Sequence, residues 1–362
     1  MIDEVLHISS GMNEEGGGTA HLGRLSGRAM RRFCARRGLR LTGFHLPAPD
    51  GGVALDGYQS FGGSKSGLGA ALVGRLAFTP GRKAIFADHI GPARTLGHLP
   101  RRMLPRYTVQ LHGIEVWREL SWDRRRTLAN ASFLVANSQY TASRLLDYFP
   151  AQLDIRVVLL GVERARLVGR SHTRTLDVVG EGYVLIVGRI AGHERYKGHD
   201  ELLEAWPELV RRLPEARLVV AGSGSDLPRL RAKATELGLG EAVIFTGQVD
   251  PATLTELYRR AAIFAMPSLL EGFGLVFVEA MAAGKPCIAC AGTAPAEIVV
   301  EGETGLLVSA SHALVDALAA LLGNPERARA MGAAGRRRYE AEFTAEAYER
   351  RLEPVLEALV DG

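Results

Sequence analysis

Short apolar runs alternate along the chain with segments whose apolar residues recur at helical spacing. In the second half the apolar runs are YVLIVGR, RLVVAGSG, AVIFTGQV, IFAMPS and PCIAC. In the first half the corresponding runs are VLHISSG, RLTGFHL, AIFADH, YTVQLHG and FLVANS. Alternation of strand and helix, with glycine at the turns, is typical of parallel sheets flanked by helices. The sequence therefore predicts an α/β protein with two doubly wound, Rossmann-like domains.

A polar, weakly patterned stretch at residues 163–181 separates the two series of strands. We expect an N-terminal domain over residues 1–172 and a C-terminal domain over residues 173–343. The helical segment 344–362 follows the complete second sheet, and we expect it to pack back on the first domain. Open parallel sheets bind ligands outside the C-terminal ends of their strands. Two such domains that face each other would form a cleft, where we expect the ligand.

Composition excludes a few classes of protein. With 362 residues, 47% of them hydrophobic and 23% charged, the chain resembles an ordinary globular protein. It has neither the run of about 18 apolar residues that a membrane span needs nor a signal peptide, so we expect a cytoplasmic protein. Cys287 and Cys290 form a Cys-x-x-Cys pair in an apolar run, without a second pair of metal ligands. We interpret them as buried apolar side chains rather than a redox or zinc site.

Charge is unevenly distributed along the chain. Residues 1–176 hold 25 Lys and Arg against 13 Asp and Glu, whereas residues 177–362 hold 19 against 27. The basic half suggests an anionic partner, either nucleic acid or membrane headgroups, although a merely solvated basic surface is the alternative. Nucleic acid is disfavoured, because no aromatic interleaving or known binding module accompanies the arginines.

The first predicted helix, residues 19–37, concentrates this positive charge. One side carries Leu22, Leu25, Ala29 and Phe33, and the other carries Arg24, Arg28, Arg31, Arg32, Arg36 and Arg37. With the basic segment LGHLPRRMLPR at residues 96–106, this face is suited to an anionic bilayer. We therefore expect a protein that can lie peripherally on the inner face of a membrane.

The segment EGFGLVFVEAMAAGKP, Glu271–Pro286, holds two carboxylates among apolar residues, where a buried charge is costly unless it is paired. Its glycines and proline predict a helix over Leu275–Ala283, with Glu271 just before the helix and Glu279 within it. A helix N-terminus preceded by glycines suits a phosphate or another polar ligand group. Taken alone, Glu271 could equally be a charge that the helix dipole favours, and Glu279 a buried partner in a salt bridge.

Two cations are also predicted in the loop between a strand and a helix. Arg189 directly follows a predicted strand, and Lys197 with Gly198 begins the next predicted helix. Both are expected at the C-terminal edge of the sheet, where a pair of cations suits a diphosphate leaving group without a metal ion. The alternative is two surface cations that bind nothing.

Together with AGSG at Ala221–Gly224, FTGQV at Phe245–Val249 and GTAPAEIV at residues 292–299, these segments resemble the donor half of the group 1 glycosyltransferases. That is the large retaining family with the GT-B fold, and the resemblance covers residues 183 to about 308. Glu271 and Glu279 match its Glu-x7-Glu signature.

The resemblance implies a role for each matched residue. Glu271 would contact the hydroxyls of the donor sugar and Glu279 those of the ribose. Arg189 and Lys197 would hold the diphosphate. The charged insert AGHERY before Lys197 departs from the family pattern, and it leaves open whether Arg195 joins or replaces a phosphate contact. The backbone that meets the sugar and phosphates would be that of Gly272, Phe273, Gly274 and Leu275, and the backbone that passes the nucleobase would be that of Gly247 to Val249.

The first half matches the family less tightly. The stretch EEGGGTAHL, with Gly17 and Gly18, lies where the family has a glycine loop over the diphosphate-sugar and acceptor. It is not the dinucleotide G-x-G-x-x-G fingerprint. His112 with Gly113 resembles the family's His-Gly at the sugar site, and Glu115 lies where a carboxylate often accompanies it. A lone histidine is more often a core residue, but its position at the end of a strand favours a site.

The resemblance implies a retaining, metal-independent enzyme that moves a hexose, for example glucose or mannose, from a UDP- or GDP-sugar to a hydroxyl acceptor. The acceptor would be a sugar, a lipid-linked precursor or a polysaccharide precursor, and no metal cofactor is expected. The catalytic candidates are His112, Arg189, Lys197 and Glu271. The alternatives are a nucleotide-sugar 2-epimerase, an NAD-dependent dehydrogenase and a non-catalytic sugar-nucleotide binder.

Overall fold

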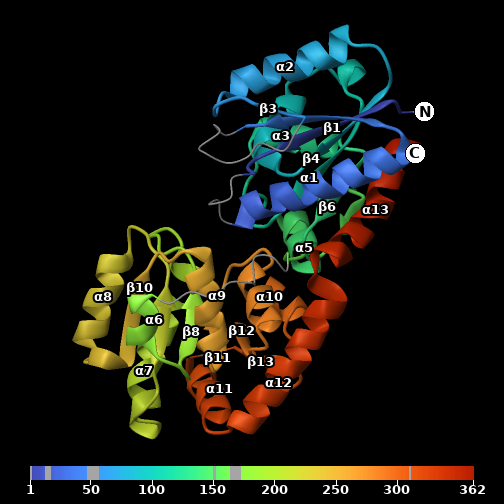
Figure 1. Cartoon of the computed structure of the whole chain (residues 1–362). Helices are drawn as coiled ribbons and strands as arrows, with labels where there is room; N and C mark the ends of the chain where they lie inside the picture. The colour runs from blue at the N-terminus through green and yellow to red at the C-terminus, as the bar shows by residue number, and fades with distance from the viewer. Residues whose placement is uncertain (1, 13–17, 47–56, 150–151, 164–172, 310) are drawn as a thin grey trace. The chain divides into compact units, whose positions relative to one another are not determined.

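The computed structural model describes residues 2–12, 18–46, 57–149, 152–163, 173–309 and 311–362, and every element below lies in these ranges (Figure 1). The chain divides into two compact units. Unit 1 comprises residues 1–160 and 345–362, and unit 2 comprises residues 161–344. The division falls slightly before the polar stretch in which the sequence analysis placed its boundary.

Unit 1 is built on a parallel sheet whose described strands run in the order β3-β2-β1-β4-β5-β6-β7. In that spatial order they are β3 (Tyr58–Ser60), β2 (Arg40–His45), β1 (Glu4–Ser9), β4 (Lys83–Ala87), β5 (Arg106–Leu111), β6 (Phe133–Ala136) and β7 (Ile155–Val157). Strands β1 and β4 are buried along their whole length. The order reverses between them, so their C-terminal ends mark the point where ligands bind to sheets of this type.

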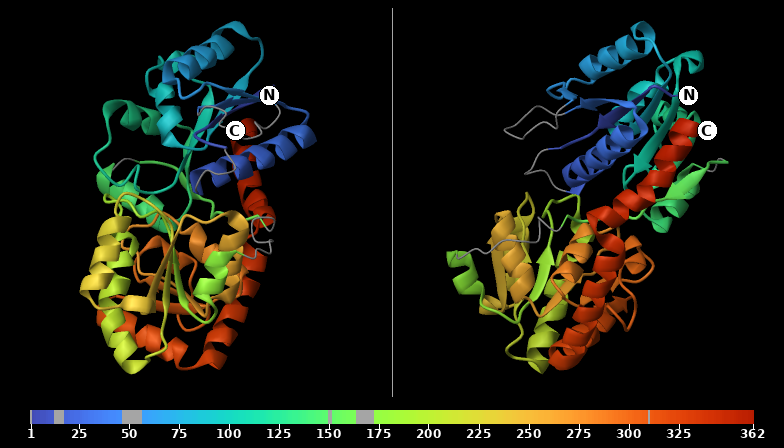
Figure 2. Two further views of the ribbon diagram at one scale, coloured as in Figure 1. Left: turned by 60° about the vertical axis from the view of Figure 1, so that its left-hand side comes forward. Right: turned by 45° about the vertical axis from the view of Figure 1, so that its right-hand side comes forward.

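Helices cover this sheet. They are α1 (Gly18–Arg37), α2 (Lys65–Phe78), α3 (Ile90–Gly97), α4 (Trp122–Ala129), α5 (Gln139–Tyr148) and α13 (Ala345–Asp361), with a 3-10 turn, η1 (Arg101–Met103). The predicted apolar side of α1 is buried, including Leu25 and Phe33. The last helix, α13, lies along α1 and also contacts β4 and β5 (Figures 1 and 2).

Unit 2 has a second parallel sheet, in the order β10-β9-β8-β11-β12-β13. Its strands are β10 (Val243–Gly247), β9 (Leu218–Ala221), β8 (Val184–Val187), β11 (Ile263–Met266), β12 (Cys287–Cys290) and β13 (Gly305–Val308). The order reverses between β8 and β11, which pair through Val184 with Ile263 and Leu185 with Phe264. The loops that follow these two strands therefore lie side by side.

The other elements of unit 2 are helices and helical turns. They are α6 (Arg174–Val179), η3 (Arg195–Lys197), α7 (His199–Arg212), α8 (Leu227–Glu236), η4 (Gly240–Ala242), α9 (Pro251–Arg260), α10 (Leu275–Ala282), η5 (Ala294–Glu297), α11 (Ser311–Leu322), α12 (Pro325–Arg338) and the π turn η6 (Tyr339–Phe343). The segment APAEIVVEG, between β12 and β13, forms only the 3-10 turn η5. Gly302, at φ +74, ends the segment in a turn where Val300 donates to the Thr304 hydroxyl.

Candidate functional site

The loops after β8 and β11 bring together three of the predicted site residues of unit 2. Lys197 Nζ lies 3.4 Å from Glu271 Oε2, and the two side chains are 17% and 20% exposed. Arg189 begins the same loop that ends at Lys197. The sequence analysis placed Arg189 and Lys197 at the sheet edge and Glu271 just before a helix, and the β8–β11 pairing is what places Lys197 next to Glu271.

Gly198 explains how Lys197 comes so close to the β11 loop. It has φ +89 and directly precedes α7. A Cβ atom at this position would lie 2.7 Å from the Pro267 Cδ atom. Glycine therefore allows both the left-handed backbone and the close approach of the two loops.

Arg189 is oriented by a carboxylate that the sequence analysis did not single out. Its Nε donates to Glu194 Oε2 at 2.8 Å, and its Nη2 binds Glu194 Oε1. Partial burial opposes ionisation of Glu194, but the hydrogen bond from Arg189 and the charge of Lys197 lower the pKa of its carboxyl. The Arg189 side chain nevertheless remains 66% exposed.

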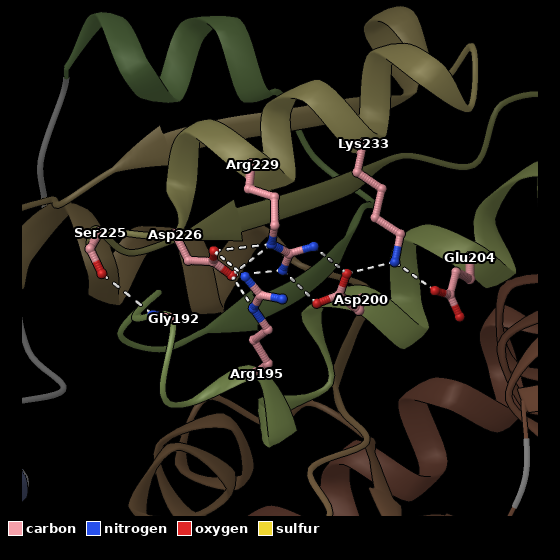
Figure 3. Close-up of polar contacts among 8 residues, drawn as sticks. All are labelled: Gly192, Arg195, Asp200, Glu204, Ser225, Asp226, Arg229 and Lys233. Atoms are coloured by element: carbon pink, nitrogen blue, oxygen red, sulfur yellow. Dashed lines mark hydrogen bonds and ion pairs between the residues drawn. The ribbon is translucent and has the colours of Figure 1, made fainter.

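Arg195 takes part in an ion-pair network that ties the insert to α7 and α8 (Figure 3). Its Nη2 donates to Asp226 Oδ1 at 3.2 Å. Asp226 also binds Arg229, which makes two bonds of 2.8 and 2.7 Å to Asp200. The hydrogen bond from Arg229 lowers the pKa of Asp200 to about 2, so the network is ionised at neutral pH. In this arrangement Arg195 braces the loop that carries Lys197.

Glu279 lies on α10, inside the fold, and is only 7% exposed. One of its oxygens accepts a hydrogen bond of 3.0 Å from the hydroxyl of Tyr258, a buried residue of α9. Sequence reasoning missed Tyr258, because it lies 21 residues before Glu279, on a different helix. The hydrogen bond satisfies one oxygen of this buried carboxylate.

The start of α10 is shaped by glycine. Gly274 has φ +98, and a Cβ atom there would lie 2.7 Å from the Phe277 ring. Phe273 is buried and packs edge-on against Phe343, so its side chain anchors the loop. Leu275 follows as the first residue of the helix. With Gly272, these residues bring a helix N-terminus, and its backbone N–H groups, next to Glu271.

A second set of glycines closes the edge on the β9 and β10 side. A Cβ atom at Gly222 would lie 1.9 Å from the Gly188 carbonyl oxygen, so the loop after β9 can pack directly on the Arg189 loop. The N–H of Gly222 donates to the carbonyl of Gly247 at 2.9 Å. Gly247 has φ +70 at the end of β10, and Val249 follows it, partly exposed. The segment predicted to pass the nucleobase is thus separated from the loop that carries Arg189 only by the backbone of the loop after β9.

In unit 1, His112 follows β5. Its Nε2 lies 2.5 Å from the backbone oxygen of Asp88. A carbonyl oxygen can only accept, so Nε2 carries the hydrogen and Nδ1 is an acceptor in the neutral ring. Within the described ranges, Nδ1 is buried and has no hydrogen-bond partner. Glu115 accepts from the backbone N–H of His112, and the Asn137 side chain donates to the His112 carbonyl at 2.9 Å.

Asp88 and His89 complete this cluster, and the sequence analysis missed both. The Asp88 carboxylate accepts from Ser9 Oγ at 2.6 Å and from the backbone N–H of Ser10 at 2.8 Å, and burial raises its pKa to about 6. The His89 ring stacks on that of His112, with centroids 5.6 Å apart. Burial and the neighbouring His112 lower the pKa of His89 to about 4. The sequence did contain a signal for these two residues, because Asp88 and His89 end the apolar run AIFADH. That run forms β4, and the strand order reverses between β1 and β4.

The structure also bears on the predicted glycine loop and on the two cysteines. Gly17 lies outside the described residues, and Gly18 is the first residue of α1. Cys287 and Cys290 are buried, unbridged residues of β12, as interpreted from the sequence. No group of three or more His, Cys, Asp or Glu suited to a metal ion occurs in the part of the chain that the structure describes.

The basic face of α1 differs from the expectation. Arg32 pairs with Glu349 at 2.7 Å, Arg36 with Glu353 at 2.6 Å and Arg37 with Asp361 at 2.5 Å. The acidic partners belong to α13, more than 300 residues further along the chain, so local sequence could not reveal them. At least these three arginines of the basic helix face are therefore paired within unit 1. No helix in the described ranges is both long and apolar enough to cross a membrane.

Comparison with known proteins assigns the family. The model of the glycosyl transferases group 1 matches residues 171–338. The GDP-mannose-dependent alpha-(1-6)-phosphatidylinositol monomannoside mannosyltransferase of Mycolicibacterium smegmatis is 34% identical over 264 residues, which cover 68% of each chain. The D-inositol 3-phosphate glycosyltransferase of Nocardia farcinica is 39% identical over 222 residues, or 58% of this chain and about half (49%) of that relative.

Solved structures agree on the fold. Sucrose-phosphate synthase from Thermosynechococcus elongatus is 23% identical and superposes with a TM-score of 0.79 over 99% of both chains. Anabaena HepE in complex with UDP is 18% identical, with a TM-score of 0.75 over 98% of this chain and 100% of that one. At these identities the likeness shows the fold alone, which is that of the GT-B glycosyltransferases. The chain therefore belongs to the group 1 glycosyl transferases and is a glycosyltransferase with the GT-B fold.

Proposed function

We propose that the protein transfers a hexose from a UDP- or GDP-sugar to a hydroxyl of a sugar or lipid-linked acceptor, with retention of anomeric configuration and without a metal ion. The observation that carries this proposal is the grouping of Arg189, Lys197 and Glu271 at the β8–β11 reversal. Two cations and one carboxylate at that edge are what a sugar joined to a diphosphate needs.

Lys197 has a double role in this proposal. Its ammonium group lies 3.4 Å from Glu271, the carboxylate that would accept from the sugar hydroxyls. The same group, with the exposed guanidinium of Arg189, would balance the charge of the diphosphate. The N-terminus of α10 adds backbone N–H groups beside the sugar. Glu279 would accept from the ribose hydroxyls, and Gly247 to Val249 would pass the nucleobase.

The reaction we propose is front-face substitution at the anomeric carbon. The bond from that carbon to the β-phosphate oxygen breaks while the acceptor oxygen attacks from the same side, and the departing phosphate takes the acceptor's proton. Arg189 and Lys197 stabilise the charge that develops on the leaving group. Most of the remaining acceleration would come from orientation of the two substrates. For His112 we propose a contact from Nδ1, the unfilled acceptor, to a hydroxyl of the sugar.

The names of the relatives narrow the first substrates to test. One is a GDP-mannose-dependent enzyme that acts on a phosphatidylinositol mannoside, and another is a D-inositol 3-phosphate glycosyltransferase. These names support GDP-mannose as the first donor and phosphorylated polyols or lipid-linked glycans as the first acceptors. We place the reaction at the cytoplasmic face of a membrane.

A thermal-shift screen with UDP, GDP, ADP and their common sugars tests donor binding, because a ligand of the folded state raises the melting temperature. The donor found in this way is then incubated with acceptors, and the anomeric configuration of the product is determined by NMR. We expect retention and full activity in EDTA. An inverted product, loss of activity in EDTA, or turnover of the donor without any acceptor would each contradict the proposal.

A further inference from the structure

A tryptophan lies exposed on the first turn of α4. Trp122 is 60% exposed, although large aromatic side chains are usually buried. Residues three and four positions further on share its side of the helix, and here they are Arg125 and Arg126. The opposite side of α4 holds the buried residues Asp123 and Thr127. The outward side of this helix is therefore aromatic and basic.

The segment after α3 lies beside this helix and extends its basic surface. The His98 ring contacts the Trp122 ring at 5.6 Å. The Arg126 guanidinium lies over the same ring at 5.3 Å, and its Nη2 donates to the carbonyl of Leu99. The 3-10 turn η1 follows two residues later and exposes two further arginines. We name as the Trp122 patch the residues His98, Arg101, Arg102, Trp122, Arg125 and Arg126.

The acidic residues nearby do not cancel this charge. Asp123 is buried and binds Arg94 and the Ser121 hydroxyl. It also lies 3.7 Å from His98 Nε2. Glu119, which is exposed, precedes α4. The four arginines of the patch thus outnumber these two carboxylates, of which one is already bound by Arg94, and the patch keeps a positive charge.

We propose that the Trp122 patch is the surface through which the protein lies on an anionic lipid bilayer. Tryptophan favours the headgroup region, because its ring is apolar and its N–H is polar. Arginines near an anionic leaflet add electrostatic attraction. The basic face of α1, by contrast, is engaged with α13 through Arg32, Arg36 and Arg37. The proposed bilayer surface therefore keeps the basic segment 96–106 of the sequence analysis and replaces the α1 face with that of α4.

A pocket beside the patch fits a lipid-anchored acceptor, and this step rests on the proposed function. The pocket has a volume of about 350 Å³, and its lining includes Leu46, Lys65, Leu68, Gly91, Arg94 and His98. His98 belongs to both the pocket and the patch. Gly91, which also lines the pocket, donates to Nδ1 of His89, whose ring stacks on His112. A headgroup held at the bilayer would thus meet a partly apolar lining whose charged residues are Lys65, Arg94 and Asp123.

Co-sedimentation with lipid vesicles tests the patch. The full-length protein is mixed with vesicles of phosphatidylcholine alone or of phosphatidylcholine with phosphatidylglycerol. We expect binding only to the anionic vesicles, and a loss of affinity of at least about tenfold in the double variant Arg101→Glu, Arg102→Glu. Trp122→Ala should weaken binding as well. Arg28→Glu, an exposed position of α1, is the matched control and should bind as the wild type does.

Several results would overturn the proposal. They are equal binding to both kinds of vesicle, wild-type binding by the double variant, an equal loss in Arg28→Glu, or a preference for RNA or DNA over anionic vesicles. Arg101 and Arg102 are exposed, so the double variant should keep the wild-type melting temperature even if Trp122→Ala unfolds. Turnover of a water-soluble acceptor separates the two proposals. It should be unchanged in the double variant, whereas its absence in the wild type would count against the proposed function alone.

Discussion

Lys197 is the residue on which the donor site depends most, because its ammonium group faces Glu271 and ends the loop that begins at Arg189. In Lys197→Ala we expect turnover to fall about 100- to 1,000-fold, the loss usual for one group that stabilises a developing oxyanion. The melting temperature should change little. Arg211→Ala, on the exposed last turn of α7, is the control and should keep full activity. Steady-state kinetics with near-normal turnover in Lys197→Ala would refute the phosphate role.

Tyr258 is predicted to position Glu279 for the ribose. Tyr258→Phe removes the 3.0 Å hydrogen bond to the buried carboxylate, so we expect a loss of about 1–3 kcal/mol in unfolding free energy and a raised KM for the donor. Tyr183→Phe is a matched control in the same unit, since that hydroxyl donates to a backbone carbonyl, of Leu257, at 2.8 Å. It should lose stability and keep its KM. Equal KM values in both variants would contradict the positioning role.

Asp88 predicts a pH dependence of stability. Its pKa is raised from 3.8 to about 6, chiefly by burial, so the folded state binds more protons than the unfolded state between these values. Stability from this group is therefore present at low pH and is lost as pH rises through about 6, by about 3 kcal/mol in total. In urea unfolding, the free energy of unfolding of Asp88→Asn should rise relative to that of the wild type between pH 4 and 7. A constant difference would refute the raised pKa.

At the scale of single residues, sequence reasoning found groups whose position follows from the backbone alone. Arg189 and Glu271 follow strands of a parallel sheet, and such strands end at one edge. Glu194 and Tyr258 were missed, because their roles depend on side chains that meet across a folded loop or between helices. A motif can place a ligand-binding residue without showing which neighbour orients it.

At the scale of elements, the loop from Arg189 to Lys197 is predicted to owe its shape to Asp226. That carboxylate binds both Arg195 and Arg229 (Figure 3). In Asp226→Asn we expect kcat/KM for the donor to fall about tenfold, less than in Lys197→Ala, because only the support of the site is weakened. Glu204→Gln changes the far end of the same network, where Glu204 binds Lys233, and serves as the control. If both variants had the same kinetics, the loop would not need this support.

The strands of each sheet could be predicted to different degrees. Central strands such as β4 and β11 are buried on both faces, so they appear in the sequence as continuous apolar runs. The strands that were missed, β3, β7 and β13, lie at or next to the sheet edges and are three or four residues long. The polar sequence YQS of β3 has no pattern from which a strand could be inferred. Short edge strands are specified by the neighbour they pair with.

At the scale of the whole molecule, the chain leaves unit 1 near residue 160 and returns to it at residue 345. The two crossing segments are joined, since Val162 N–H donates to the carbonyl of Phe343 at 2.8 Å. Unit 1 is therefore complete only when α13 has returned to α1, β4 and β5. A fold of this connectivity makes the last helix a structural part of the first unit.

Two neighbouring residues of α13 allow the contributions of apolar burial and of charge pairing to the position of this helix to be separated. Leu352 is fully buried, whereas Glu353 forms a solvent-exposed ion pair with Arg36. We expect Leu352→Ala to lower the unfolding free energy by about 2–5 kcal/mol, because it leaves a cavity. Glu353→Gln should cost about 0–1 kcal/mol, because exposed ion pairs are screened. Urea unfolding measures both. A larger cost for Glu353→Gln would mean that charge pairing with α1, rather than apolar burial, returns the chain to unit 1.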